Sequence, residues 1–457
     1  MIFFLASLGL TALLTALLIR FWPFSIGVDH PDSHRKKHAG PILRLGGMPI
    51  FLVFVLMMLL VPFIAERAFT TWSAILFTSG LIFLLGLMDD FRPIGARMKL
   101  AGQLAIATLA YFMGLRIEVL TVPMGELEIN LAWLSFFVTV IWLISVPNII
   151  NLIDGVDGLA GGLGFFLYVT LGYVAWTGGL TEVAAVSLAV AGALAGFLCF
   201  NFPPARIFLG DGGAYFIGYG IAALSLQSSQ KGSVAAVLLV TVIALGLPIM
   251  DTLLALIRRA VRGFPLFRPD AEHIHHRLKG LGFSERRLVL LMYFVTVTLS
   301  VLALSVFWSQ GRTLPIAVGF LFLLLVLAVR YLGYVWSWAD LDLQVVQSFG
   351  RRQEVRYVLA SARLAELEAL HCRTPEEFSA CIEAMLNRCG LHVQRPTEGE
   401  YEEVVLDFRQ ADSLVLWVPS SKMDRNHRRR LADCFRPALE AAYQRWGVRR
   451  IVGGGDR

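Results

Sequence analysis

Acidic and amide side chains recur at a fixed spacing in a polar stretch near the middle of the chain, PNIINLIDGVDGLAGG at residues 147–162. Asn148, Asn151, Asp154 and Asp157 follow one another every three residues, so on a helical turn each is rotated by about 60° from the last. This spacing predicts a fan of polar atoms that can surround a ligand. The glycines between them let the backbone approach that ligand closely.

Three further acids stand at the ends of apolar runs. Asp89 and Asp90 end LIFLLGLMDDF, and because neighbours on a helix point about 100° apart, we expect them to have different partners. Asp211 lies between two glycines in FLGDGG, where a polar loop gives way to an apolar run. Solvated helix ends and an ordinary turn are the alternatives. Carboxylates gathered at such boundaries favour a shared site with a divalent cation.

Two basic segments complement these acids. The first, DHPDSHRKKHAGPILRLGG, carries Arg44, and the second, HIHHRL, carries His273, His275, His276 and Arg277. Both Arg and His can donate hydrogen bonds to phosphate oxygens, Arg as a bidentate fork. Zinc is an alternative for the histidines, but no carboxylate or cysteine stands at a familiar companion spacing. The first segment has a simpler alternative as a positively charged loop that sets membrane topology.

The composition is that of a membrane protein. Hydrophobic residues make up 56% of the 457 residues and charged residues only 16%, with a mean hydropathy of +0.66. A net charge of +6 would suggest nucleic acid in a soluble chain, but here the basic residues mark membrane loops, so no nucleic-acid partner is expected. The five cysteines show no CxxC spacing and are expected to be reduced, unpaired thiols.

Eleven apolar runs are long enough to cross about 30 Å of hydrocarbon. The first lacks a basic segment before it, so we expect a membrane span there and not a cleaved signal peptide. The runs lie at residues 1–22, 47–65, 72–88, 100–115, 131–147, 159–177, 183–200, 213–228, 233–250, 288–308 and 313–333.

The loops between these runs form two alternating sets that differ in charge. One set holds sixteen Lys and Arg residues and the other holds four. The positive-inside bias therefore places the first set in the cytosol, with the N-terminus outside, the C-terminus inside and every candidate site residue on the cytosolic face. The cytosolic set comprises residues 23–46, 89–99, 148–158, 201–212 and 251–287.

The composition changes near residue 340, where long apolar runs stop and Glu, Arg and Gln appear at helical spacing. We therefore predict an all-α polytopic membrane domain over residues 1–333. A small cytosolic α+β module follows over residues 341–457, and its function is not indicated by its sequence.

Acids, glycine-hinged loops and cationic donors on one membrane face are typical of a site for a metal-bound, highly anionic substrate. Because the site lies at the membrane boundary, one substrate is expected to be a lipid. The rival interpretation is a transporter whose acids line an ion or proton path.

Four motifs in this order resemble one family. Asp89–Asp90 after an apolar helix, NIINLIDGVDGLAGG, FLGDGG and HIHHRL are similar to the motifs of the polyprenyl-phosphate N-acetylhexosamine-1-phosphate transferases, over residues 1–333. HIHHRL resembles the undecaprenyl-phosphate N-acetylglucosamine-1-phosphate transferases more than the muramoyl-pentapeptide transferases. The DGxxAR signature of the CDP-alcohol phosphotransferases is missing, because GVDGLAGG follows Asp154.

The resemblance implies transfer of a sugar 1-phosphate from a UDP-sugar to undecaprenyl phosphate, with release of UMP, at the bacterial cytoplasmic membrane. It implies Mg²⁺, or Mn²⁺, held by Asp211 and Asp154, with Asp89 and Asp90 holding or deprotonating the lipid phosphate. The remaining implied contacts are Asp154, Asp157, Asn148 and Asn151 along the nucleotide and metal side, Phe208 stacked on the uracil, and His273, His275, His276, Arg277 and Arg44 on the diphosphate or sugar.

The acceptor phosphate is mostly dianionic at neutral pH, because the second pKa of a phosphomonoester is about 6. A strong general base is therefore hardly needed, which favours a single displacement over a covalent intermediate on an Asp. The sequence leaves open which N-acetylhexosamine is transferred and whether UDP-MurNAc-pentapeptide is the donor. It also leaves open which polymer receives the product and whether the protein forms a homodimer.

Overall fold

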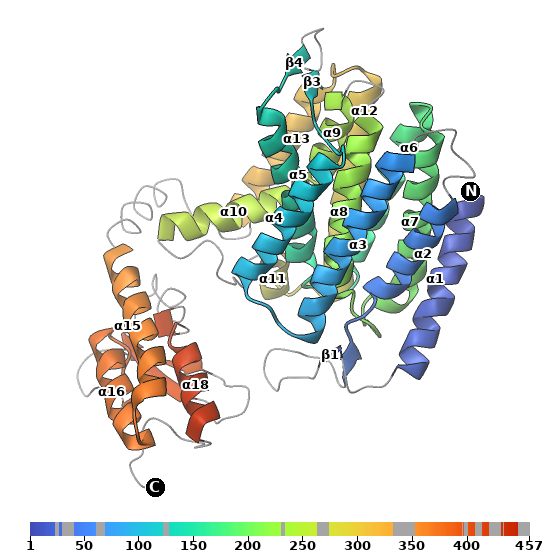
Figure 1. Cartoon of the computed structure of the whole chain (residues 1–457). Coiled ribbons are helices and arrows are strands. Elements are labelled where there is room, and N and C mark those ends of the chain that lie inside the picture. The colour runs from blue at the N-terminus through green and yellow to red at the C-terminus, as the bar shows by residue number, and fades with distance from the viewer. Residues whose placement is uncertain are drawn as a thin grey trace. The chain divides into compact units, whose positions relative to one another are not determined.

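The computed structural model describes residues 1–22, 27–29, 41–60, 69–121, 128–229, 234–262, 274–331, 352–394, 396, 401–406, 414–419, 431–432 and 434–446. The chain divides into two compact units. The larger takes Met1–His30, Gly40–Leu256 and Pro269–Trp336, and the smaller takes Pro31–Ala39, Ile257–Arg268 and Ser337–Arg457. Helices of the C-terminal part are orange to red in Figure 1.

Long apolar helices make up most of the chain before residue 332, as its runs of Leu, Ile, Val, Phe and Ala predict. Short polar or glycine-rich segments separate them. In chain order the helices, including the short and polar α11, are α1 (Ile2–Phe21), α2 (Gly47–Leu60), α3 (Phe69–Phe91), α4 (Ala96–Phe112), α5 (Leu134–Ile153), α6 (Leu159–Thr177), α7 (Thr181–Asn201), α8 (Gly210–Ser229), α9 (Val234–Ala244), α10 (Gly246–Arg262), α11 (Ile274–Gly280), α12 (Glu285–Trp308) and α13 (Leu314–Tyr331).

Each of the eleven predicted apolar runs falls on a helix, and the run at 233–250 is shared by α9 and α10. Among the described residues, six helices are long and apolar enough to cross a membrane, namely α1, α3, α5, α6, α7 and α12. The α9–α10 pair, bent by 64°, is a seventh if it counts as one span. The chain is therefore a polytopic membrane protein by length and composition, whereas eleven spans and the orientation of the termini stay predictions.

Helix α8 is the element against which the site-bearing helices pack. Helices α2, α3, α5 and α6 all contact it (Figure 1). Small residues allow the closest approaches: a Cβ on Gly218 of α8 would lie 2.5 Å from Cα of Pro147 in α5. A Cβ on Gly86 of α3 would lie 2.6 Å from the backbone carbonyl of Asp211. Backbones this close leave no room for a side chain, so the end of α3 is fixed against the start of α8.

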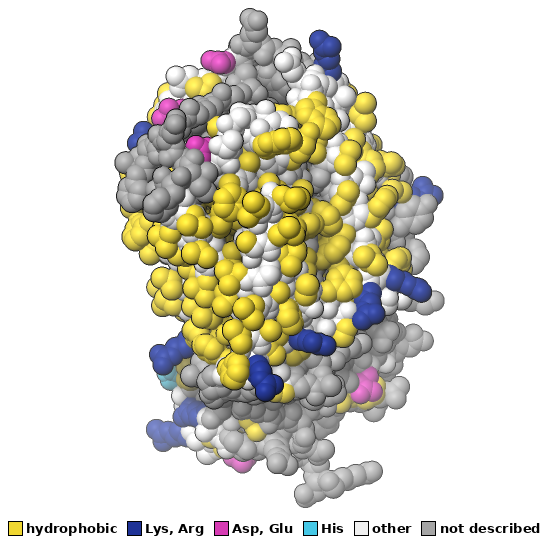
Figure 2. Space-filling view, turned by 90° about the vertical axis from the view of Figure 1, so that its right-hand side faces the viewer, with side chains coloured by type: hydrophobic (Ala, Val, Ile, Leu, Met, Phe, Trp, Pro, Cys, Tyr) yellow, Lys and Arg dark blue, Asp and Glu magenta, His cyan; other side chains and the backbone are white. Residues whose placement is uncertain are grey.

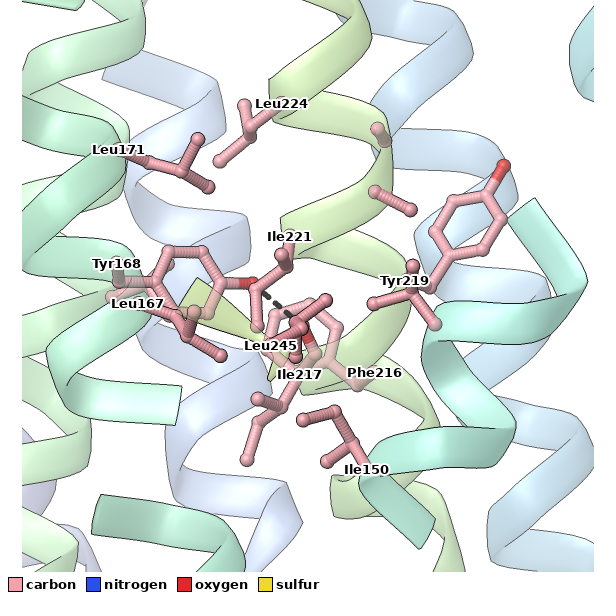
Figure 3. Packing of buried hydrophobic residues seen from close by; sticks show 14 of the residues in the cluster. Ile150, Leu167, Tyr168, Leu171, Phe216, Ile217, Tyr219, Ile221, Leu224 and Leu245 are labelled. Carbon is pink, nitrogen blue, oxygen red and sulfur yellow. Dashed lines mark hydrogen bonds between the residues drawn. The ribbon is translucent and has the colours of Figure 1, made fainter. Parts of the chain in front are cut away.

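Aromatic and aliphatic side chains fill the space between α5, α6 and α8 (Figure 3). The Tyr168 ring of α6 is fully buried, and its hydroxyl donates to the carbonyl oxygen of Ile217 in α8 at 3.1 Å. Ile150 of α5 and Phe216 of α8 are also fully buried in this cluster. Because the one polar atom of the Tyr168 side chain has a partner, this ring is buried between the site helices without an unsatisfied hydroxyl.

Apolar side chains also cover much of the outer surface. Figure 2 shows a broad hydrophobic face with Lys and Arg side chains gathered near its lower margin. Phe77 of α3, Ile141 of α5 and Phe294 of α12 are each more than half exposed. A continuous surface of this kind is unfavourable in water and suits contact with lipid.

Strands are short throughout the described residues. In the larger unit β1 (Val28–Asp29) pairs with β2 (Ile42–Leu43), and β3 (Val119–Thr121) pairs with β4 (Glu128–Asn130), both antiparallel. The smaller unit contains α15 (Arg352–His371), α16 (Pro375–Arg388) and α18 (Arg436–Trp446). It also contains an antiparallel hairpin of β5 (Tyr401–Leu406) and β6 (Leu414–Pro419). Phe378, Leu416 and Phe435 lie in its own apolar core.

Candidate active site

Three helix ends carry the predicted acids. Asp89 and Asp90 occupy the last turn of α3, which stops two residues before Pro93 because a residue before proline avoids the helical conformation. Asp154 follows α5 directly, and Asp211 is the second residue of α8. Since α3 and α5 both pack against α8, the three ends have a common neighbour.

Lys99, in the first turn of α4, lies between two of these acids. Its Nζ is 2.6 Å from Asp89 Oδ2 and 2.7 Å from Asp211 Oδ2. The three side chains are only 14–29% exposed, so water and salt screen these pairs less than they screen surface pairs. Asp89 Oδ1 accepts the backbone N–H of Ile94 at 2.7 Å, which fixes the orientation of the carboxylate. Carboxylates from two different helices thus converge on one cation.

Asp90 has a different set of partners. Its Oδ1 accepts the backbone N–H of Asp211 at 2.9 Å, and its Oδ2 accepts the N–H of Gly212 at 3.0 Å. These N–H groups lie at the start of α8 and have no partner within their own helix. Asp90 therefore caps α8 from α3, where a negative charge is also favoured by the helix dipole. The prediction that Asp89 and Asp90 have different partners is confirmed.

The loops of Arg44 and Phe208 pair with each other beside this cap. Phe208 donates its N–H to the Leu43 carbonyl at 2.8 Å and accepts the N–H of Gly46 at 2.9 Å. Gly210 has a φ of +80°, and a Cβ there would collide with the Arg44 carbonyl and lie 2.7 Å from Asp90 Oδ2. Glycine is required at this position, and it brings the backbone of Arg44 next to the first turn of α8.

Asp154 lies in the loop between α5 and α6, close to the other acids. Burial, followed by the negative charges of Asp211 and Asp90, raises the pKa of the Asp154 carboxyl well above its usual range. The positive charge of Arg44 opposes this rise. A cation bound among these carboxylates would lower that pKa again, because opposite charge favours the ionised form.

Asp157 holds the loop that leads to α8. Its Oδ2 accepts the backbone N–H of Ala205 at 2.9 Å. Next to it, Asn201 Oδ1 accepts the N–H of Gly158 at 3.0 Å, and Asn201 Nδ2 donates to the Ile207 carbonyl at 2.8 Å. These bonds tie the loop before α6 to the loop before α8, so Asp157 occupies a structural position beside the acids.

Helix α12 holds the same two loops from another side. The Tyr293 hydroxyl donates to the Gly158 carbonyl, and Arg286 Nε donates to the Pro203 carbonyl at 2.8 Å. A Cβ on Gly162 would collide with the Tyr293 ring, so glycine is needed where the ring lies against α6. The acidic loop is therefore fixed by a helix far along the chain.

The two predicted amides point to different partners. Asn148 Nδ2 donates to Gln103 Oε1 of α4 at 2.7 Å and to the Ile144 carbonyl at 2.8 Å. Gln103 is buried, with 2% of its surface exposed. Asn151, one turn closer to the end of α5, interacts with the Asp211 carboxylate. Of the two, Asn151 is thus the one placed among the acids, and Asn148 links α5 to α4.

The histidine segment is described in part. His273 lies outside the described residues, as do the side chains of His275 and His276. Arg277 is half-buried on α11. The start of α11 is held by Asp251 of α10, a buried acid whose Oδ1 accepts the N–H of Ile274 at 2.9 Å. The segment thus begins at a fixed point next to the bend between α9 and α10.

The oxygen donors fit a hard divalent cation. Within the ranges that the structure describes, no group of three or more His, Cys, Asp or Glu side chains is arranged as a metal centre. Mg²⁺ does not require one, because it takes one or two carboxylates and completes its shell with water and substrate phosphates. The meeting of Asp89 and Asp211 at the Lys99 ammonium marks a position that favours a cation. Binding of Mg²⁺ or Mn²⁺ here stays a prediction, and the carboxylate oxygens at this position suit either ion.

Several residues of this arrangement are absent from the sequence prediction. Lys99 could have been identified from the sequence, because burying a lysine one turn into an apolar helix costs free energy and such a lysine is usually paired with an acid. Gln103, one turn later, carries the same signal more weakly. Asp251, Arg286 and Tyr293 act through contacts between distant helices, and nothing local in the sequence marks them.

Known proteins resemble this chain over its membrane part. The model of glycosyl transferase family 4 matches residues 72–229, the stretch that contains all five acids. The probable undecaprenyl-phosphate N-acetylglucosaminyl 1-phosphate transferase of Bacillus subtilis (strain 168) is 35% identical over 323 residues, 71% of this chain and 88% of that protein. The chain belongs to glycosyl transferase family 4. The family predicted from the four motifs is thereby confirmed.

Two more relatives indicate the range of the family. The decaprenyl-phosphate N-acetylglucosaminephosphotransferase of Mycobacterium tuberculosis (strain ATCC 25618 / H37Rv) is 33% identical over 349 residues, 69% of this chain and 86% of that protein. The phospho-N-acetylmuramoyl-pentapeptide-transferase of Halalkalibacterium halodurans is 33% identical over 319 residues, 65% of this chain and 94% of that protein. Family 4 proteins with different sugar groups in their names thus match this chain about equally well.

Proposed function

We propose that this family 4 protein transfers N-acetylhexosamine 1-phosphate, with GlcNAc 1-phosphate as the first candidate, from a UDP-sugar to undecaprenyl phosphate. UMP is released, and the lipid-linked diphosphate sugar starts a cell-envelope polysaccharide. The observation that carries the proposal is the meeting of Asp89 and Asp211, from two helix ends, at Lys99. The names of the Bacillus and Mycobacterium relatives support a polyprenyl phosphate acceptor and a GlcNAc group.

The reaction is a single displacement at phosphorus. An oxygen of the lipid phosphate forms a bond to the phosphorus that carries the sugar, the bond from that phosphorus to the bridging oxygen breaks, and UMP leaves with the electron pair. The acceptor is already dianionic, so the protein need not remove a proton. The site lowers the barrier mainly by positioning the lipid phosphate against the diphosphate of the UDP-sugar and by neutralising their negative charges. An Asp nucleophile is the alternative route.

On the acceptor side, Lys99 holds the lipid phosphate and Asp89 orients Lys99. Both oxygens of Asp90 accept backbone N–H groups, so its proposed role is to position Asp211. Asp211 and Asp154 would hold Mg²⁺, which when bound neutralises the charge of the diphosphate. Asp157 fixes the acidic loop through Ala205.

The donor side is proposed to be formed by the paired loops and by the histidine segment. Phe208 lies three residues before Asp211 and is the candidate for stacking on the uracil. Asn151 lines the nucleotide side, with Asn148 holding the helix behind it. The candidate diphosphate and sugar donors are Arg44, His273, His275, His276 and Arg277.

We also propose that the site faces the cytosol of a bacterial cell, in an inner-membrane protein of eleven spans with its N-terminus outside. The distribution of basic residues between the loops supports this topology. A homodimer belongs to the proposal as well.

The test is transfer of label from UDP-GlcNAc, radiolabelled in the sugar, to undecaprenyl phosphate by the purified full-length protein, with and without Mg²⁺ or Mn²⁺. We expect organic-extractable label that requires the metal, with UMP as co-product. Asp211→Asn should abolish it. Glu182→Gln, which also neutralises an acid in the first turn of a helix, is the matched control and should retain it.

Three results would contradict the proposal. UDP as co-product would mean simple glycosyl transfer, and normal transfer by the Asp211 variant would remove its role. No labelled lipid from any UDP-N-acetylhexosamine, together with ion flux across sealed vesicles, would favour the transporter.

The second candidate has the same chemistry with UDP-MurNAc-pentapeptide as donor. The Halalkalibacterium relative, named for that group and covered over 94% of its length, favours it. Running both donors in one competition assay decides between them, because the preferred donor suppresses lipid labelling from the other.

A further inference from the structure

Helix α15 of the smaller unit is apolar on two opposite faces. One face carries Val355, Val358 and Ala362, which are buried against α16 and α18. The other face carries Tyr357, Leu364 and Leu367, which are 50%, 48% and 43% exposed. A soluble helix normally has one apolar face and one polar face. The second apolar face of α15, orange in Figure 1, therefore needs an explanation.

The exposed residues of this face, four of them apolar and the last a histidine, follow a seven-residue repeat. Tyr357, Ala360, Leu364, Leu367 and His371 are separated by three, four, three and four positions, and all five are exposed. This is the a/d spacing by which one helix packs along another. We call these five residues the α15 seam. A scattered set of surface leucines would not keep this order over two full repeats.

Charges of opposite sign flank the α15 seam. Arg356, Arg363 and the exposed Leu370 lie along one side, at the g positions of the repeat, and Ser361 and Glu368 lie along the other side, at the e positions. In the single chain, Arg363 pairs with Glu366 of its own helix at 2.6 Å, on the exposed surface where such a pair contributes little and can exchange partners. In a parallel pair each g residue faces the e residue five positions later on the partner helix. Arg363 of one helix would then face Glu368 of the other. In an antiparallel pair Arg would face Arg and Glu would face Glu.

We propose that the α15 seam joins two copies of this chain as a parallel pair of helices. The charge pattern is complementary to itself in that orientation alone. A parallel helix pair has a two-fold axis along the seam, so this contact between two identical chains is closed and self-complementary.

A lipid surface fits the α15 seam less well. Helices that lie on anionic membranes carry Lys or Arg along both flanks of their apolar face. Here one flank carries Glu368, whose charge the surface would repel. The seam is also short, so the pair would be weak between free modules in solution. Confinement of both copies to one membrane raises their effective concentration and makes a weak contact sufficient.

The first experiment is disulfide cross-linking of the full-length protein in membranes. Ala360→Cys lies in the seam, and Ala380→Cys, at another exposed alanine on α16, is the matched control. Both are made after Cys199→Ser and Cys381→Ser, since the other cysteines among the described residues are buried. We expect oxidation to give a dimer from the Ala360 variant and not from the control. Equal cross-linking of the two, or none, overturns the proposal.

The second experiment tests the orientation by charge reversal. Arg363→Glu or Glu368→Arg alone places like charges across both symmetric contacts and should lower the cross-linked fraction of the Ala360 variant about five-fold. The two reversals together should restore it, and Arg388→Glu on α16 should leave it unchanged. A membrane-bound helix predicts instead that Glu368→Arg strengthens lipid contact and that the double variant shows no rescue. That pattern, measured with the same variants by flotation on anionic vesicles, would refute the pairing.

Discussion

Replacing Asp90 by Ala is expected to loosen the start of α8. The carboxylate accepts the N–H groups of Asp211 at 2.9 Å and Gly212 at 3.0 Å, and a hydrogen bond to a charged acceptor contributes about 1.5–3 kcal/mol. Because both bonds share one partly buried carboxylate, we expect the free energy of unfolding to fall by about 2–4 kcal/mol. Asn keeps one acceptor oxygen but turns an NH₂ group toward the second donor, so about half of that loss is expected.

Activity should fall in the same order as stability. The released N–H belongs to Asp211, and displacing a group at a reaction site by about 1 Å typically costs about 100-fold in rate. We therefore expect Asp90→Ala to lower kcat about 100-fold and Asp90→Asn about tenfold. Unfolding is followed by SDS titration in mixed micelles, and kcat by transfer of labelled sugar phosphate to the lipid.

Thr374→Ala is the matched control, because Thr374 caps α16 in the smaller unit by accepting the N–H of Glu377 at 3.2 Å. It should lower stability and leave transfer unchanged. A general base at Asp90 would behave differently: Asn would then remove activity as completely as Ala while unfolding stayed normal. That result would refute the positioning role.

Substitutions at three further positions test the arrangement around this cap. Lys99→Met leaves two like charges facing each other and should lower transfer at least about tenfold, while Lys99→Arg keeps the charge and should lose less. Asp157→Asn keeps an oxygen that can accept the Ala205 N–H and should retain transfer, while Asp157→Ala should lower the free energy of unfolding by about 1–2 kcal/mol in SDS titration. Gly86→Ala presses a methyl group on the start of α8 and should cost about 1–3 kcal/mol and most of the transfer activity. Gly80→Ala, on the same helix with its nearest neighbour at 3.8 Å, is the control and should change neither.

Local sequence properties were enough to predict the helices. Hydropathy over a span-length window locates α1, α3, α5, α6, α7 and α12, because each must be apolar along its whole length to lie in lipid. The different partners of Asp89 and Asp90 followed from helix geometry alone. Membership of glycosyl transferase family 4 followed from the order of four motifs.

The partners themselves depend on packing between distant segments and could not be predicted in the same way. Asp90 caps α8, more than a hundred residues later in the chain, because Gly86 lets the two backbones meet. Asp157 has the spacing of a site residue, yet its carboxylate supports a loop. In the sequence, Lys99 is only one of the basic residues that indicate membrane topology. In the structure, the carboxylates of Asp89 and Asp211 both pair with it.

The cap at α8 also limits what can neutralise the substrate. A helix start attracts phosphate through its unpaired N–H groups, but at α8 two of them already donate to Asp90. Positive charge must therefore come from side chains and bound ions. Four carboxyl groups, Asp89, Asp90, Asp154 and Asp211, share the positive charges of Lys99 and Arg44, and the raised pKa of Asp154 shows that these two charges are too few to ionise all four. A diphosphate donor and a phosphate acceptor would add further negative charge, which is the physical reason to expect a divalent cation among these carboxyl groups.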